Sequence, residues 1–197
     1  MKYTLKEFGT SILATLGLAV LLGGVYPAAV WGLAQIFPRQ AGGSLVLEKD
    51  KVVGSELIGQ NFTSDRYFTA RPSAAGNGYD AANSGGSNLG PLSQKLIDGV
   101  KDRVAEYRKK NGLADNVPVP ADAVLASASG LDPHISVRNA LLQAPRVAKT
   151  RGIREEIVRH YIEERTEKRA FGFLGDPGVN VLLLNLDLDG YPAQERK

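Results

Sequence analysis

The sequence contains no cysteine among its 197 residues and only two histidines. The absence of cysteine excludes disulfide bonds, thiolate metal sites and thiol catalysis together. His134 and His160 stand apart from other ligand-type residues, so we interpret each as a surface or capping residue and not as a metal ligand. Cysteine-free domains occur on both sides of membranes, so this absence does not identify the compartment.

The motifs of common catalytic centres are also missing. The sequence has no Gly-x-Ser-x-Gly elbow, no Ser followed three residues later by Lys, and no Gly-x-x-x-x-Gly-Lys-Ser/Thr phosphate loop. The pattern Asn185-x-Asp187-x-Asp189-Gly190 imitates the start of a calcium loop, but Arg196 occupies the twelfth position, where a bidentate Glu is required. We therefore expect no catalytic residues and no metal site.

Charge of one sign does not accumulate anywhere in the chain. The 24 Lys and Arg against 21 Asp and Glu leave a net charge of +3, which is spread along the sequence and argues against nucleic acid as a partner. The densest basic stretches have acidic residues nearby, so we interpret them as solvated helix faces. They are Arg108 to Lys110 and the series Arg146, Lys149, Arg151, Arg154.

Charge is absent altogether from Phe8 to Pro38, which predicts a membrane span. The best core is Ile12–Ile36, whose helix would be about 37 Å long, against a hydrocarbon layer of about 30 Å. The predicted organisation is a tail at 1–11, a transmembrane helix at 12–36 and a soluble domain at 37–197. A cleaved signal peptide is the alternative, but no Ala-x-Ala cleavage site lies near this segment.

The predicted span is a weak helix by itself, because glycine lowers helix propensity and proline removes a backbone hydrogen bond. Small residues also let another helix approach closely, so we expect this helix to pack against partner helices; a kinked anchor that touches only lipid is the alternative. The residues concerned are Gly17, Gly23, Gly24, Gly32 and Pro27.

Positive charges on the two sides of the predicted span almost balance. The short N-terminal tail favours a cytoplasmic N-terminus and an extracytoplasmic domain.

The soluble domain is predicted to begin with a β-hairpin formed by Ser44–Leu47 and Val52–Val53. The 38 residues from Gly54 to Pro91 then include seven glycines and two prolines, which is typical of a functional loop or a linker. Within this stretch, backbone N–H groups of the Ser84-Gly85-Gly86-Ser87-Asn88 segment are a candidate anion or nucleotide contact. A turn that docks on a protein surface is the alternative.

The remaining elements follow from apolar periodicity. Helical spacing predicts helices at Leu92–Lys110, at Ser136–Arg151 with a kink or restart at Pro145, and at Ile153–Lys168. Alternation of Leu with Asn and Asp predicts a strand over Leu184–Asp189 with one wet face. Strands at both ends with helices between them indicate an α+β domain after one N-terminal transmembrane helix.

Read in order, these segments resemble the C subunit of the bacterial Kdp potassium-transporting P-type ATPase. The resemblance covers nearly the whole chain, although Leu125 stands where similar sequences commonly carry Thr and the tail from Tyr191 has no clear counterpart. It rests on Gly23-Gly24-Val25-Tyr26-Pro27, Gly54-Ser55, Leu57 to Phe62, Tyr67-Phe68, Arg71-Pro72-Ser73-Ala74, Ser84 to Leu89, Ala126 to Asp132, Gln143, Arg146-Val147-Ala148, Val179-Asn180-Val181 and Leu184-Asn185.

The resemblance implies a complex with a potassium-channel-like subunit, an ATP-hydrolysing P-type subunit and a small single-span subunit in the cell inner membrane. The implied role is assembly together with action as a catalytic chaperone that raises the ATP affinity of the pump subunit. ATP would then belong to the complex, and the chain would need no cofactor of its own. A free-standing membrane-anchored binding module is the alternative. The candidate partner contacts are Gly23, Gly24, Tyr26, Pro27, Arg71, Pro72 and Ser73.

Overall fold

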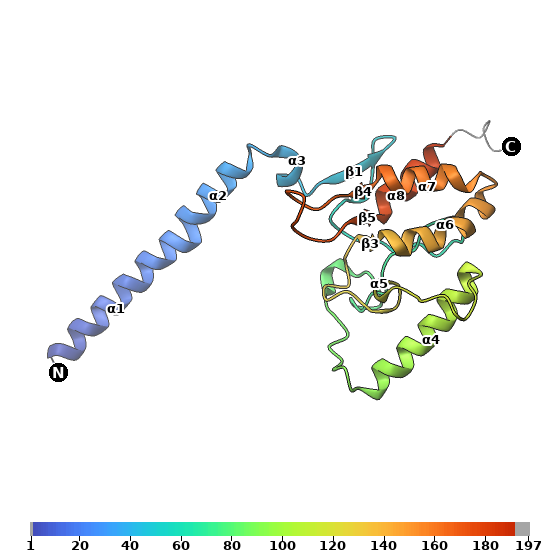
Figure 1. The fold of residues 1–197 in the computed structure, drawn as a ribbon. Coiled ribbons are helices and arrows are strands. Elements are labelled where there is room, and N and C mark those ends of the chain that lie inside the picture. Colours follow the sequence, from blue (N-terminus) through green and yellow to red (C-terminus); the bar gives the residue numbers. More distant parts are fainter. Residues whose placement is uncertain (1, 192–197) are drawn as a thin grey trace. The chain divides into compact units, whose positions relative to one another are not determined.

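The computed structural model describes residues 2–191 and divides the chain into two compact units, Met1–Leu45 and Val46–Lys197. The first unit is a run of helix composed of α1 (Lys2–Val20), the π-helical segment η1 (Leu21–Val25) and α2 (Tyr26–Ala34), followed by the short α3 (Pro38–Ala41) (Figure 1). Thr4–Ala34 is long and apolar enough to cross a membrane, with a mean hydropathy of 1.9. The predicted N-terminal apolar helix is confirmed as a candidate membrane span.

The π-helical segment lies immediately before Pro27 and has a local cause. In a regular α-helix the proline ring would clash with the carbonyl oxygen of Gly23, four residues earlier. The structure widens the turn instead, so that the Tyr26 N–H donates to the Leu21 carbonyl oxygen, five residues back. The helix therefore continues through the glycine pair and the proline without interruption.

The second unit opens with the predicted hairpin, formed by β1 (Leu45–Glu48) and β2 (Lys51–Ser55). Lys49 and Asp50 form its two-residue turn with φ values of 48° and 62°. Two central residues with positive φ are typical of the type I′ turn, whose twist matches that of the flanking strands. The prediction of a hairpin at this place is confirmed.

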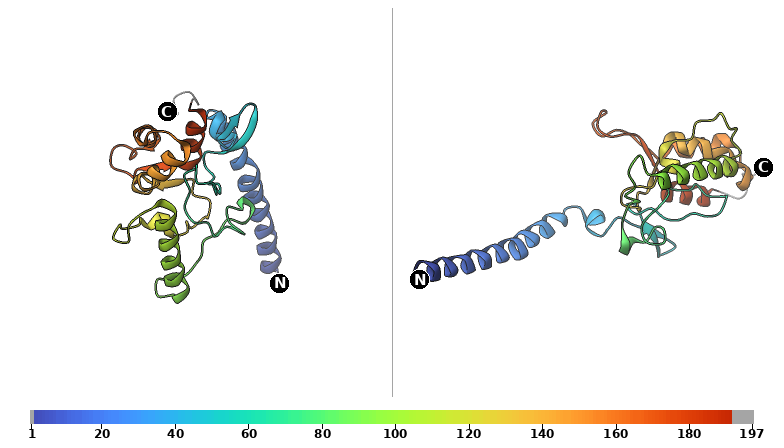
Figure 2. Two further views of the ribbon diagram at one scale, coloured as in Figure 1. Left: turned by 90° about the vertical axis from the view of Figure 1, so that its right-hand side faces the viewer. Right: turned by 90° about the horizontal axis from the view of Figure 1, so that it is seen from below.

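A second, three-stranded sheet lies at the centre of this unit. Its strands are β3 (His134–Ser136), β5 (Gly178–Asn180) and β4 (Thr166–Glu167), in the order β3-β5-β4, and both pairs are antiparallel. Ile135 pairs with Val179, so both apolar side chains enter the core. The helices α6 (Val137–Arg151) and α8 (Val181–Gly190) pack against this small sheet, and α7 (Glu155–Glu164) packs against both of these helices (Figure 2). The α+β prediction is confirmed.

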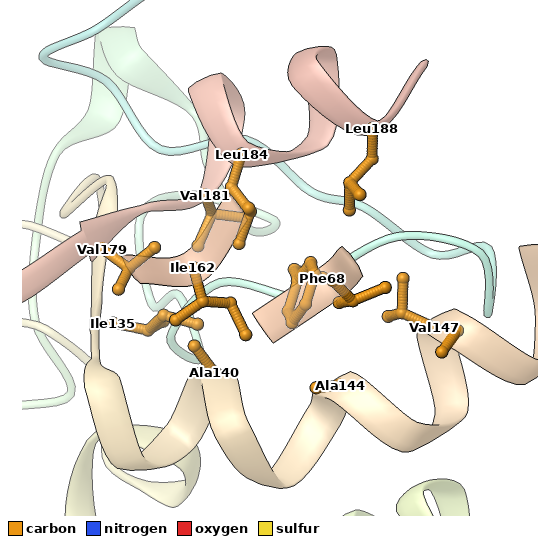
Figure 3. Close-up of a cluster of buried hydrophobic side chains, with 12 residues drawn as sticks. Phe68, Ile135, Ala140, Ala144, Val147, Ile162, Val179, Val181, Leu184 and Leu188 are labelled. Carbon is orange, nitrogen blue, oxygen red and sulfur yellow. The ribbon is translucent and has the colours of Figure 1, made fainter. Parts of the chain in front are cut away.

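The hydrophobic core joins the sheet, these helices and one residue of the irregular segment, Phe68 (Figure 3). Phe68 is fully buried and lies among side chains of α6 and α8, although it belongs to no helix or strand. The buried cluster comprises Phe68, Ile135, Ala140, Ala144, Val147, Ala148, Val158, Ile162, Val179, Val181, Leu184 and Leu188. The segment between β2 and α4 is therefore part of the folded body.

The helices agree in part with the expectations. The helix predicted over Leu92–Lys110 is α4 (Gln94–Asn111), which Gly112 ends with a left-handed φ of 64°. Helix α6 begins at the predicted Ser136 cap, whose Oγ accepts the Asn139 N–H, and it runs through Pro145 as one element, so a restart at Pro145 is wrong. Two short helices, η2 (Ala81–Asn83) and α5 (Ala121–Val124), complete the unit.

The predicted strand over Leu184–Asp189 is wrong, because these residues belong to α8. Leucine at every second position imitates a strand. Besides Leu182, however, the buried side chains of α8 recur with a helical period, at Val181, Leu184, Asn185 and Leu188. The Asn180 side chain accepts the Leu183 N–H and so caps the helix. The strand of this region is the shorter β5, which ends at the cap residue.

The third predicted helix is also shorter than expected: α7 ends at Glu164, and Thr166–Glu167 form β4.

Candidate functional site

The irregular segment from Gly54 to Pro91 is fixed in place by buried polar side chains of α6. Gln143 is fully buried; its Oε1 accepts the Thr69 N–H at 2.9 Å and its Nε2 donates to the Thr69 carbonyl oxygen at 3.1 Å. The side-chain amide thus makes the same pair of N–H···O=C hydrogen bonds that a neighbouring β-strand would make. A side-chain amide thus satisfies backbone groups that have no strand beside them.

Asn185 of α8 makes the same kind of contact with the preceding residue of the segment, Phe68. Its Oδ1 accepts the Phe68 N–H at 2.8 Å, and its Nδ2 donates to the Phe68 carbonyl oxygen at 3.0 Å. Phe68 is consequently held by its backbone as well as by its ring. Two amides from two different helices therefore fix two consecutive residues of the segment.

Arg146 and Arg151 extend this support, and the expectation that their basic series is a solvated face is wrong for both. Arg146 is 8% exposed; its guanidinium donates to the carbonyl oxygens of Asp65 and Tyr67 and, through Nε, to Asn111 Oδ1 at 2.9 Å. Arg151 donates to the Arg66 carbonyl oxygen at 2.7 Å and pairs with Asp189 at 3.0 Å. A guanidinium group has five N–H donors, so it can hydrogen-bond to several carbonyl oxygens of an irregular segment at once.

A second part of the segment, around Ser73, is tied to residues 130–132. Ser73 Oγ donates to the Gly130 carbonyl oxygen at 2.6 Å and accepts the Tyr79 N–H at 2.7 Å. The Tyr79 hydroxyl donates to the Arg71 carbonyl oxygen, and burial raises the pKa of Tyr79 to about 12. Arg71 itself pairs with Asp132 at 2.8 Å.

Gly130 is where these pieces of chain come closest together. Its φ is +69°, and a Cβ added there would lie 2.7 Å from the Ala75 nitrogen and 2.8 Å from the Gly85 carbonyl oxygen. Both the backbone conformation and the lack of space therefore require glycine. The backbones of residues 75, 85 and 130 can approach each other only because this position has no side chain.

The glycine-rich Ser84–Asn88 segment docks against the neighbouring loop. The Gly85 N–H donates to the Ser129 carbonyl oxygen at 2.9 Å, and Ser84 Oγ donates to the same oxygen at 3.0 Å. A Cβ on Gly86 would lie 3.0 Å from the Ala128 carbonyl oxygen. The glycines thus permit close backbone contact within the unit, and at least one N–H of the candidate anion site is already bonded to protein.

An open cleft of about 720 Å³ lies between α4 and the two loop regions just described. It brings together Pro72, Ser73 and Ser87 of the predicted contact residues. Apolar side chains and backbone form most of the wall, and Lys95 and Arg103 add positive charge. The lining comprises Pro72, Ser73, Ala74, Gly76, Ser87, Leu89, Lys95, Leu96, Gly99, Arg103, Leu125 and Ala126. Protein interfaces are about as apolar as the rest of a protein surface, and the composition of this cleft falls within that range.

Other predicted contact residues lie away from this cleft. Arg71 lines a different depression together with Asp132, and Gly23, Gly24, Tyr26 and Pro27 belong to the first unit. Among residues 2–191, no group of three or more His, Asp or Glu side chains is arranged to hold a metal ion. The two histidines have acidic neighbours: His134 contacts Glu167 at 3.1 Å and His160 contacts Glu164 at 3.3 Å.

Sequence reasoning missed the contribution of α4 to the cleft, namely Lys95, Leu96 and Arg103. The one available signal was Gly99, since glycine inside a helix costs about 1 kcal/mol relative to alanine and often marks a close approach or a functional surface. The Arg103 Nε donates to the Val124 carbonyl oxygen at 2.6 Å. This bond holds the 125–126 wall beside α4.

Comparison with known proteins gives consistent matches over nearly the whole chain. The family model "K+-transporting ATPase, c chain" (KdpC) matches residues 8–190. A potassium-transporting ATPase KdpC subunit of Koribacter versatilis is 51% identical over 186 residues, which cover 94% of this chain and 95% of that relative. The KdpC subunit of Mycobacterium bovis BCG is 55% identical over 171 residues, covering 86% and 90%. That of Acidobacterium capsulatum is 52% identical over 186 residues, covering 94% and 98%.

Proposed function

The chain belongs to the KdpC family of K+-transporting ATPase c chains and is a subunit of a potassium-transport complex, and we propose that it acts there as a non-catalytic assembly subunit and catalytic chaperone. In this role it raises the affinity of the ATP-hydrolysing subunit for ATP. Its partners are that subunit, a potassium-channel-like subunit and a small single-span subunit. ATP is bound and hydrolysed by the complex, and this chain supplies contacts.

The observation that carries the proposal is the fixed conformation of the Gly54–Pro91 segment beside an open cleft. Amides and guanidinium groups of α6 and α8 hold the segment, and Gly130 brings its loops together. A surface that is ordered before binding loses less conformational entropy when a partner docks. We propose that this surface contacts the outer face of the channel-like subunit.

The helix Thr4–Ala34 is proposed to be the single membrane span, with a cytoplasmic N-terminus and the second unit outside. Its side chains are exposed along its length, and a Cβ added at Gly17, Gly23, Gly24 or Gly32 would meet no atom of residues 2–191 within 4 Å. Small residues on an exposed apolar helix favour close packing against other helices in a bilayer. We propose that the Gly23–Pro27 stretch, where the helix widens into a π-turn, is one of these contacts.

This orientation bears on the alternative of direct nucleotide binding at Ser84–Asn88. Cytosolic ATP does not reach an extracytoplasmic unit, and the Gly85 N–H is already bonded to Ser129. An effect on ATP affinity then has to be transmitted through contacts between subunits, as a coupling free energy between separate sites. Protease accessibility of the second unit in sealed right-side-out vesicles tests the orientation, and a protected unit would contradict it.

A matched pair of substitutions tests the cleft as a partner surface. Leu125 lines the cleft and is 37% exposed, whereas Leu92 is 93% exposed and does not line it. In the assembled complex, Leu125→Glu should raise the KM for ATP or reduce copurification in mild detergent by about tenfold, which corresponds to about 1.4 kcal/mol. Leu92→Glu should leave both unchanged.

Three results would contradict the proposal in different ways. If neither substitution affects copurification or the KM, the cleft is not a partner surface. If the unsubstituted chain accumulates stably and no other subunit copurifies with it, the free-standing anchored binding module is the better description. Labelling of the purified chain by a photoreactive ATP analogue at Ser84–Asn88 would support direct nucleotide binding instead.

A further inference from the structure

The hairpin between β4 and β5 carries an exposed apolar tip that the cleft and the span leave unexplained. Residues 168–177 project from the body of the second unit as a narrow loop (Figures 1 and 2). At the tip, Phe171 is 89% exposed, Phe173 74% and Leu174 58%. Exposed singly, such residues are ordinary, but three adjacent large ones at the end of a projection indicate an apolar contact.

Part of the backbone of this tip is hydrogen-bonded within the hairpin itself. Ala170 and Leu174 exchange two bonds of 2.9 Å, and the N–H groups of Gly172 and Phe173 donate to the carbonyl oxygens of Arg169 and Ala170 at 3.1 and 3.3 Å. The turn achieves this with Phe171 and Gly172 at positive φ, 53° and 82°. Unpaired backbone polar groups are costly in lipid, so these bonds lower the cost of placing the tip at the boundary between headgroups and acyl chains, where the remaining carbonyl groups still reach water.

Charge begins just behind the apolar tip. Arg169 pairs with Asp176 across the hairpin at 3.1 Å, and Lys168 precedes it with an exposed side chain, whereas residues 170–175 carry no charge. An apolar end followed by a basic and polar collar matches the layering of a membrane interface, where aromatic rings lie at headgroup level and Lys or Arg face the phosphates.

The tether limits how far this unit can lie from the bilayer. Only 11 residues separate Ala34, the last residue of the apolar helix, from Val46, the first residue of the second unit. Even fully extended they span at most about 40 Å.

We propose that the tip of this hairpin, Ala170–Gly175, inserts into the lipid interface as a second membrane contact of the chain. Phe171, Phe173 and Leu174 enter the boundary between headgroups and acyl chains, and Lys168 and Arg169 remain at the phosphates. The contact would restrict the rotation of the second unit about its tether. The inference rests on the membrane anchorage given under Proposed function.

The absence of cysteine makes a direct test practical, since each introduced cysteine is the one labelling site of the full-length chain. Phe173→Cys carries an environment-sensitive fluorophore, and vesicles of phosphatidylcholine and phosphatidylglycerol contain lipids that carry one nitroxide near the headgroup, which reports on the tip, or one near the end of an acyl chain, which reports on the middle of the span. We expect blue-shifted emission that the nitroxide quenches, both for the chain alone and for the complex copurified with its partners. Leu92→Cys is the exposed control and Leu21→Cys the control within the span.

The outcomes distinguish a failure of the hairpin proposal from a failure of the proposed membrane anchorage. If the label at residue 21 is quenched and the label at residue 173 is not, the hairpin proposal fails and the anchorage stands. If neither is quenched, the anchorage itself fails. Blue-shifted emission without quenching in the complex would assign the tip to a protein partner and overturn the proposal. Adding Phe171→Ser and Leu174→Ser around the label should reduce the quenching; unchanged quenching would also overturn it.

Discussion

The Gly54–Pro91 segment and the 168–177 hairpin both depart from regular structure and both use glycine, but they are supported in opposite ways. The first segment is bonded to side chains from distant parts of the sequence, including Gln143, Arg146 and Asn185, and contributes the fully buried Phe68 to the core. The hairpin is bonded mainly to itself, and its large side chains face outward. An irregular segment whose backbone is hydrogen-bonded to distant side chains is thus held against the body of the unit. One whose backbone is bonded mainly within itself projects from the body.

The largest expected loss of stability comes from removing the Arg146 guanidinium, which donates hydrogen bonds to carbonyl oxygens of the first segment. Arg146→Met leaves the carbonyl oxygens of Asp65 and Tyr67 and the side chain of Asn111 without this donor in a buried site. We expect the free energy of unfolding to fall by about 3–5 kcal/mol. Urea unfolding of the full chain in detergent, followed by circular dichroism, measures this change.

The control for this substitution is Arg159→Met on α7. Arg159 forms an exposed i,i+4 ion pair with Glu155 at 2.6 Å, so its loss should cost no more than about 0.5 kcal/mol. Equal losses for the two variants would show that the buried network does not support the segment.

An intermediate effect is expected where two glycines share a backbone conformation but differ in their surroundings. Gly130 and Gly112 have φ values of +69° and +64°, but a Cβ would meet nothing within 4 Å at Gly112 and would meet two backbone atoms at Gly130. Gly112→Ala should therefore cost about 1 kcal/mol, the penalty of left-handed backbone alone. Gly130→Ala should cost about 3 kcal/mol, because the loops must also separate. The same urea titration measures both, and similar costs would mean that the loops adjust freely.

The smallest effect on stability is expected at the hairpin tip. Phe171→Ser combined with Phe173→Ser removes exposed rings that do not belong to the buried core, so the free energy of unfolding should change by less than about 0.5 kcal/mol. The measurement is made in detergent. A loss comparable to that of Arg146→Met would show that the tip packs on the body, and the contrast between the two regions would not hold.

Local patterns predicted the elements that depend on neighbouring residues. The apolar Thr4–Ala34 helix, the hairpin turn at Lys49–Asp50 and the Ser136 cap each follow from residues within a few positions of one another. The pattern of α8 misled because its leucines alternate, and only the sheet and α6 decide which of them are buried. The arginines of α6 were misread for the same reason, since their partners lie about 80 residues earlier in the sequence.

The sequence by itself determined that this chain has one apolar helix suited to a membrane and an α+β unit, and that it lacks the common catalytic motifs. Hydropathy, turn residues and such motifs depend on residues that are close together in the sequence. Only the tertiary structure decided that the glycine-rich segment is rigid, that Pro72, Ser73 and Ser87 share one cleft with α4, and that the rings of Phe171 and Phe173 face outward. These properties arise from contacts between residues far apart along the chain, whose partners a local pattern does not specify.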